Sequence, residues 1–149
     1  MTDRDETATQ PKPIFVLPET GKRLHFPGGN IASIMLSGEQ TGETLAVVAA
    51  TEAPDSGPPL HIHRNEDELF IVVEGHYSFF AEQRWVEIGP GGLVYLPKGI
   101  AHYYRNIGTT TGRTWIITTP SGWELFLPQY AKELAKPEGP DQNRILEIG

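Results

Sequence analysis

The feature that most constrains this chain is a succession of short apolar runs separated by turn residues. The 149 residues include 16 Gly and 13 Pro, so the chain changes direction often. Many short strands with frequent turns are typical of a β-sandwich or barrel. The sequence therefore predicts an all-β fold, with strands over Ile14–Leu17, Ile31–Leu36, Thr44–Ala50, Leu60–His63, Glu68–Val73, Tyr77–Phe80, Arg84–Ile88, Leu93–Leu96, Ala101–Arg105 and Thr114–Thr119.

The chain is long enough for one domain. The polar segment Met1–Pro13 is expected to be a flexible leader, and residues 14–127 to form the β-domain. A short helix is predicted over Pro128–Ala135, because proline favours the first turn of a helix. Residues 128–149 are accordingly assigned to a C-terminal helix and a loosely attached tail.

Composition excludes several classes of protein. There is no cysteine, so disulfides, thiolate nucleophiles and thiolate metal sites are excluded. The formal net charge of −7 and the lack of a basic cluster argue against nucleic acid as a partner. The longest aliphatic run, Leu45–Ala50, is far too short to cross a membrane, and the acidic N-terminal segment does not resemble a signal peptide. We expect a cytoplasmic protein.

Candidate metal ligands occur close together in the middle of the chain. His61 and His63 are two residues apart on a predicted strand, so their side chains leave the same face. Glu68 begins the next strand and is expected to lie near them across the turn. Two imidazoles and a carboxylate form a set that binds a divalent metal and leaves coordination positions open. His102, on a later strand, could be a fourth ligand.

The spacing of these residues resembles the first motif of the cupin family. This motif corresponds here to His61-Ile-His63, four residues, Glu68, six residues and Gly75. The chain departs from the family pattern at Asp55, where a glycine is usual six residues before the first histidine.

A later part of the chain resembles the second cupin motif. It corresponds here to Gly91, five residues, residues 97–99 (Pro-Lys-Gly), two residues, His102, three residues and Asn106. The Gly-Asp pair that usually opens this motif is Gly91-Gly92. Both departures fall on positions that shape the backbone, so they affect loop geometry and leave the ligand set intact. Asn106 is expected to hold a loop through hydrogen bonds.

The resemblance implies a double-stranded β-helix or jelly-roll barrel with one divalent transition metal inside. The implied ligands are His61, His63, Glu68 and His102, and the metal could be iron, manganese, nickel, zinc or copper. The alternative is an internal polar network of the same four residues without a metal.

The segment Pro120–Phe126 and the helix after it are similar to those of quercetin-dioxygenase-like single-domain cupins. That similarity implies cleavage by dioxygen of a small chelating substrate such as a flavonol or a diketone. Glu68 would be a ligand and also the catalytic base for the substrate's enol proton, which requires a raised pKa. Strand alternation adds Phe70, Val72 and Tyr104 as candidate pocket residues, with Trp115 as a further one.

Two other functions remain open at this level. A metal-dependent isomerase, lyase or decarboxylase would place a basic residue inside the barrel, for which Arg84 and Arg113 are the nearest candidates. A non-catalytic barrel would bind a small ligand without turnover. Because Ile14–Leu17 is an apolar segment that needs cover, we also expect a homodimer.

Overall fold

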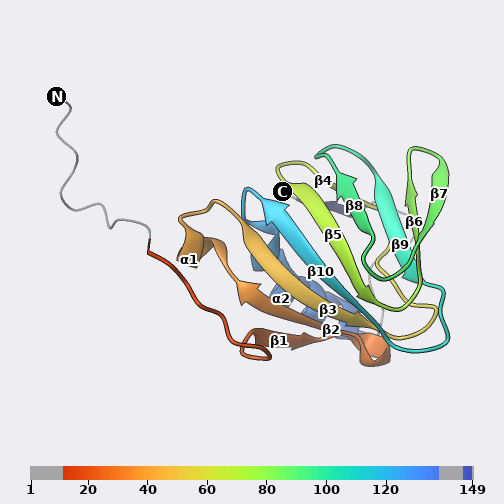
Figure 1. Ribbon diagram of the computed structural model, residues 1–149, viewed down its shortest axis with the longest axis horizontal. Helices are drawn as coiled ribbons and strands as arrows, with labels where there is room; N and C mark the ends of the chain where they lie inside the picture. The colour runs from red at the N-terminus through yellow and green to blue at the C-terminus, as the bar shows by residue number, and fades with distance from the viewer. Residues whose placement is uncertain (1–11, 138–145, 149) are drawn as a thin grey trace.

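Strands dominate the computed structural model, which describes residues 12–137 and 146–148 (Figure 1). All but the last two residues of the predicted leader Met1–Pro13 lie outside the described residues, as do positions 138–145 and 149 of the predicted tail. The expected all-β architecture is confirmed.

Two sheets face each other. The larger has the strand order β1-β2-β3-β10-β5-β8, with every pair antiparallel. Its strands are β1 (Lys22–His25), β2 (Ile31–Leu36), β3 (Ala46–Glu52), β5 (Asp67–Glu74), β8 (Leu93–Leu96) and β10 (Gly112–Thr119).

The smaller sheet has the order β11-β4-β9-β6-β7, in which β11 and β4 are parallel. Its strands are β4 (His61–His63), β6 (Tyr77–Ala81), β7 (Arg84–Ile88), β9 (His102–Asn106) and β11 (Leu146–Ile148). Three short helical elements complete the described fold: η1 (Pro27–Gly29), α1 (Gly38–Thr41) and α2 (Trp123–Ala135).

The predicted strands differ from the observed ones mainly at the two ends of the chain. Ile14–Leu17 forms no strand, although it is apolar, because its backbone pairs with no neighbouring strand. The edge strand β1 was not predicted, since Lys22–His25 is mostly polar and exposed. Leu146–Ile148, which we expected to be a loose tail, instead pairs with β4.

The C-terminal helix begins earlier than predicted. Helix α2 starts at Trp123 and carries Pro128 in its interior, whereas the sequence favoured a start at Pro128 itself. Proline lacks an N–H, so position 128 forgoes one hydrogen bond of the helix. Trp123 and Leu127 are both buried, and this packing outweighs the lost hydrogen bond.

The core lies between the inner faces of the two sheets. Phe70 of the larger sheet packs edge-on against Phe79 and Tyr104 of the smaller one, with ring centroids 5.2 Å and 5.0 Å away. Each such aromatic pair contributes about 0.5–1.5 kcal/mol beyond its burial. These rings form an aromatic layer directly beside the imidazole of His102, whose ring centre is 6.4 Å from that of Phe70.

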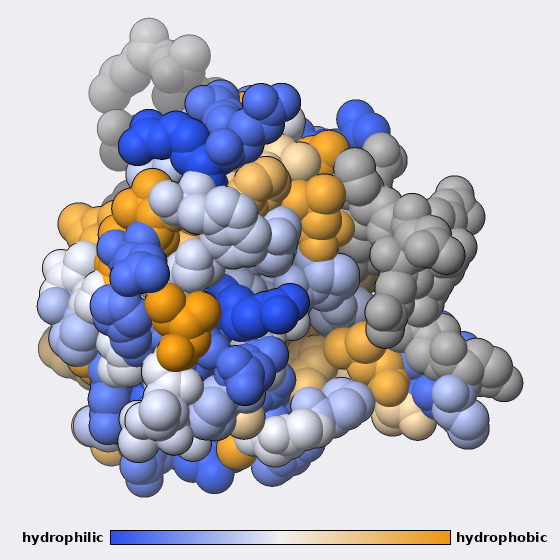
Figure 2. Space-filling model, turned by 90° about the vertical axis from the view of Figure 1, so that its right-hand side faces the viewer, coloured by the Kyte–Doolittle hydropathy of each residue, from blue (hydrophilic) through white to orange (hydrophobic). Residues whose placement is uncertain are grey.

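Figure 2 shows the face at the right-hand side of Figure 1, where apolar residues form several small separate patches among polar ones. Among the described residues, no helix is long and apolar enough to cross a membrane.

Candidate metal centre

Three strands bring the four predicted ligands together between the sheets. His61 and His63 occupy one face of β4, and His61 lies opposite His102 of β9 in the sheet register. Glu68 faces them from β5 in the other sheet. All four side chains are buried, and one donor atom from each lies within 4.8 Å of the others. The i, i+2 spacing in an extended strand is what places both β4 imidazoles in the interior.

Backbone carbonyls fix the orientation of two of the imidazoles. His61 donates from Nδ1 to the carbonyl of Pro59 at 2.7 Å, and His102 donates from Nδ1 to the carbonyl of Ile100 at 3.0 Å. A carbonyl oxygen only accepts hydrogen bonds, so each Nδ1 carries the proton. The Nε2 lone pair of both rings is therefore available to a metal.

The carboxylate of Glu68 and the Nε2 atoms of His63 and His102 lie close together but form no hydrogen bonds with one another. Glu68 Oε2 lies 2.7 Å from His63 Nε2 and 3.4 Å from His102 Nε2, yet none of these three buried atoms has a hydrogen bond of acceptable geometry. Each unsatisfied buried polar atom costs about 1–3 kcal/mol. A divalent cation at the centre of the cluster would satisfy them together, so the residues fit a metal.

The electrostatics of the metal-free cluster suit ligation at two positions. Burial, reinforced by the nearby His102, lowers the pKa of His61 to about 4, so this imidazole is neutral at ordinary pH. Burial alone would raise the pKa of Glu68, but the imidazoles of His102 and His63 lower it to about 2. Neutral imidazole and ionised carboxylate are the forms that bind metals.

His63 differs from its neighbours in its ionisation. Burial lowers its pKa, but Glu68 overcomes this effect and raises the pKa above its usual value. Binding of a metal at His63 therefore displaces a proton, and the cation must compete with it.

Glu68 is also predicted to be the catalytic base, and this second role stays a prediction. A general base is effective when its pKa lies near the working pH. The pKa of Glu68 is instead lowered to about 2, because two imidazoles stabilise its ionised form. In the metal-free cluster Glu68 is therefore ionised, which is the form in which a carboxylate can bind a metal.

A small cavity of about 50 Å³ opens beside His61 and Glu68. Tyr104, one of the predicted pocket residues, lines it, whereas Phe70 and Val72 are fully buried and do not. The full lining is Pro58, His61, Glu68, Tyr104, Ile116, Trp123, Phe126, Leu127 and Tyr130.

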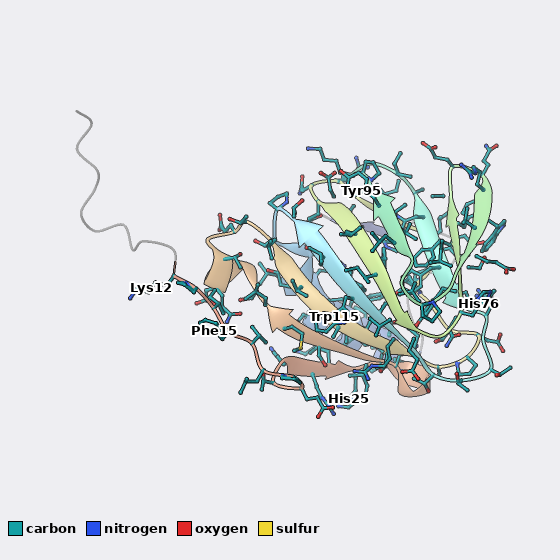
Figure 3. The ribbon with its side chains drawn as sticks, in the orientation of Figure 1. Lys12, Phe15, His25, His76, Tyr95 and Trp115 are labelled. Atoms are coloured by element: carbon teal, nitrogen blue, oxygen red, sulfur yellow. The ribbon has the colours of Figure 1, made fainter. Side chains whose placement is uncertain are left out.

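The expectation that Trp115 lines this pocket is wrong. Successive residues of β10 point to opposite faces, and the inward face carries the buried Thr114, Ile116 and Thr118. Trp115 lies on the outer face of the larger sheet, half-buried, where Figure 3 labels it. Ile116 lines the cavity in its place.

The contribution of α2 to the cavity was not predicted from the sequence. Trp123, Phe126, Leu127 and Tyr130 all line it, at the three- and four-residue spacing of one helix face. This spacing was visible in the sequence, but the start of the predicted helix at Pro128 hid it.

The other histidines lie away from the cluster, as expected. His25 is exposed at the end of β1, and His76 is half-exposed with its Nε2 3.1 Å from Glu87 (Figure 3). Asn106 holds a loop as predicted, since its amide donates to the carbonyls of Glu52 and Thr110 at 2.9 Å.

Asp55 takes the backbone conformation that the usual glycine of the first motif would allow. Its φ of 62° lies in the left-handed region, which aspartate tolerates better than most residues. This departure from the motif therefore leaves the approach to β4 intact.

Comparison with known proteins agrees with this geometry. Residues 50–118 match the family model described as Cupin domain. The chain is 26% identical over 93 residues to quercetin 2,3-dioxygenase of Bacillus subtilis (strain 168), an alignment that covers 62% of this chain but only 27% of that protein. The chain thus spans about a quarter of that relative.

Alignments with solved structures cover more of this chain than the alignment with that relative does. KdgF from a Halomonas species has a TM-score of 0.68 at 15% identity, covering 76% of this chain and 99% of that one. An RmlC-like cupin from Shewanella frigidimarina NCIMB 400 has a TM-score of 0.64 at 17% identity, covering 78% and 99%. The two facing sheets, the motif residues and the buried cluster agree with the match of residues 50–118 to the cupin domain family, whose fold this chain shares.

Proposed function

We propose that this protein is a metal-dependent oxidoreductase of the dioxygenase type. Its substrate would be small and mainly apolar, with two neighbouring oxygens as in flavonols and enolised diketones. The observation that carries this proposal is the buried His61–His63–Glu68–His102 cluster next to a cavity with an aromatic wall. The similarity to a bacterial quercetin 2,3-dioxygenase supports it.

A divalent transition metal held by these four residues would supply Lewis-acid activation of the substrate's oxygens. The side chains of the cavity would then orient the substrate. Burial raises the pKa of Tyr104 well above its usual value, and burial also raises the pKa of Tyr130 to about 12. Both hydroxyls therefore stay protonated and can donate hydrogen bonds to substrate oxygens, while Trp123, Phe126 and Leu127 exclude water.

The cavity sets a condition on substrate entry. Pockets for drug-sized ligands usually enclose about 300–1,000 Å³, far more than the roughly 50 Å³ found here. A flavonol-sized substrate thus requires α2 to move outward, whereas a small diketone needs less displacement.

An isomerase, lyase or decarboxylase with a polar or acidic substrate is less well supported. That alternative predicts a basic residue inside the barrel, but Arg84 and Arg113 are both exposed. The cavity is lined by no lysine or arginine of the described part of the chain. A non-catalytic ligand-binding barrel differs from the proposed enzyme only in turnover.

Elemental analysis of the purified protein tests the proposal first. We expect about one equivalent of iron, nickel, manganese or copper per chain, followed by dioxygen uptake with flavonols or diketones. The double variant His61→Ala/His63→Ala should lose the metal because it lacks two of the four ligands. The control His76→Ala should retain it, since His76 lies on the surface.

A double variant that keeps a full complement of metal would contradict the site assignment. Metal without dioxygen uptake would instead favour the isomerase or the non-catalytic barrel.

A further inference from the structure

Glu66 is a buried carboxylate to which neither the ligand set nor the cavity assigns a role. It lies on the turn between β4 and β5, two residues before Glu68, and is only 3% exposed. Glutamate is almost never buried to this degree unless it has a partner. Its Oε2 atom nevertheless has no hydrogen bond.

This atom faces the outer nitrogen of His63. Glu66 Oε2 lies 3.7 Å from His63 Nδ1, and His63 Nδ1 is likewise buried without a hydrogen bond. His61 and His102 each use this same nitrogen to donate to a backbone carbonyl two residues earlier. His63 alone among the three has a carboxylate at that position.

The start of α2 limits where the Glu66 side chain can lie. A Cβ atom at Gly122 would come within 3.1 Å of Glu66 Oε1, which is tighter than ordinary van der Waals contact. The absence of a side chain at Gly122 therefore leaves space for the carboxylate beside His63. The ring of Trp123, the next residue, packs edge-on to His63 with its centroid 5.9 Å away.

We infer that Glu66 is a positioning residue of the metal centre, which accepts a hydrogen bond from His63 Nδ1–H when Nε2 binds the metal. This inference rests on the metal site of the proposed function. The gap to close is about 0.8 Å, the difference between 3.7 Å and the usual 2.9 Å.

The consequence is an electronic asymmetry among the three imidazoles. A carboxylate partner makes a metal-bound imidazole a stronger donor than a neutral carbonyl does, and it fixes the ring's tautomer and orientation. His63 would therefore be the strongest of the three nitrogen ligands, and Glu66 would add negative charge next to the cation without touching it.

Zinc affinity, measured by competition with a chromophoric chelator, tests this inference without depending on turnover. Glu66→Gln keeps the size of the side chain but removes its charge, and we expect it to weaken zinc binding between 10- and 100-fold. Glu87→Gln is the matched control, because Glu87 Oε2 also contacts a histidine, His76, but at an exposed site. It should bind zinc as the wild type does.

The outcomes separate a positioning role from a structural one. If Glu66 only stabilises the turn, the variant will unfold at a lower denaturant concentration without metal, while the folded protein binds zinc within twofold of wild type. That result would overturn the inference. If the wild type itself binds no zinc, the metal site fails as well, and with it the basis of the proposed function.

Nitrogen NMR of the zinc-loaded wild type keeps the test valid if Glu66→Gln does not fold. The expected result is a protonated Nδ1 on His63 whose proton resonates furthest downfield of the three ligand rings, as a hydrogen bond to a carboxylate requires. Zinc bound to Nδ1 of His63, or a His63 Nδ1 proton indistinguishable from those of His61 and His102, would refute the role of Glu66.

Discussion

A further buried carboxyl group lies at the far end of the barrel from the candidate metal centre. Glu52 pairs with Gly112 at one end of β10, whereas Glu68 pairs with Thr118 at the other, which is about 20 Å along a strand. The Thr114 hydroxyl donates to Glu52 Oε1 at 3.1 Å. Burial raises the pKa of Glu52 from 4.5 to about 7, against the opposing effects of Tyr77 and Thr114.

This group makes the folded protein less stable as pH rises. The folded state keeps the proton of Glu52 up to about pH 7, while the unfolded chain releases it near 4.5. The unfolded state therefore binds fewer protons between these values, and the free energy of unfolding falls across the interval by about 3 kcal/mol. In Glu52→Gln this contribution disappears, because glutamine does not ionise.

Urea unfolding of the chelator-treated proteins from pH 5 to pH 8 measures the effect. Glu52→Gln should gain stability relative to wild type as pH rises, by up to about 3 kcal/mol at pH 8. The exposed Glu39 provides the control variant Glu39→Gln, which should keep the wild-type pH dependence. Parallel curves for wild type and Glu52→Gln would contradict the raised pKa of Glu52 in the folded state.

Individual metal ligands could be predicted from the sequence because the features that bring them together lie close by in the chain. Strand alternation alone places His61 and His63 on one face, and a short turn returns the chain to Glu68. Glu66 could not be assigned in this way. It belongs to the same turn, and only the packing of Gly122 and Trp123 from a distant segment shows that it is buried.

At the scale of elements, the carboxylate of Glu124 fastens α2 to the rest of the molecule. Its Oε1 accepts the N–H of Gly38 at the start of α1, and its Oε2 accepts the N–H of Gly122, both at 2.8 Å. The side chain is only 3% exposed. Glu124 therefore joins two helices that are 86 residues apart in sequence and holds the wall of the cavity in place.

Glu124→Gln should loosen this connection, since the amide offers one acceptor oxygen where the carboxylate offers two. Leaving one buried N–H unsatisfied costs about 1–3 kcal/mol of folding stability, which denaturant unfolding measures. Glu133→Gln, which on the same helix removes only the charge of a surface ion pair with Lys136, should lower stability far less. Equal stability of Glu124→Gln and wild type would show that α2 is held by its apolar face alone.

The bounds of some strands and helices could be predicted from the sequence and those of others could not, for a physical reason. Strands β2, β7 and β8 have the predicted bounds, because turn residues mark both of their ends. Strand β11 depends on pairing with β4 from across the sequence, and α2 begins where Trp123 finds a buried position. The pairing of β11 leaves no local pattern, and the apolar spacing of α2 was obscured by Pro128.

At the scale of the whole molecule, the exposed apolar residues include those of the N-terminal segment and those of the outer face of the larger sheet. The segment Ile14–Leu17, which precedes β1, is exposed, with Phe15 at 89% exposure (Figure 3). The outer face of the larger sheet exposes Val73, Leu93 and Tyr95, next to the half-buried Trp115. Exposed apolar surface of this kind is characteristic of interfaces.

We propose that a second copy of the chain covers both surfaces, with the segment Ile14–Leu17 of each protomer packed on the sheet of the other. Light scattering coupled to size exclusion should then give twice the 16.5 kDa chain mass. Phe15→Glu with Leu17→Glu should shift the mass toward one chain, because charges would be buried in the interface. Leu125→Glu, at a position 78% exposed on α2, should leave the mass unchanged. A wild-type mass of one chain at every concentration would contradict the dimer, and a dimer that survives the double variant would place its interface elsewhere.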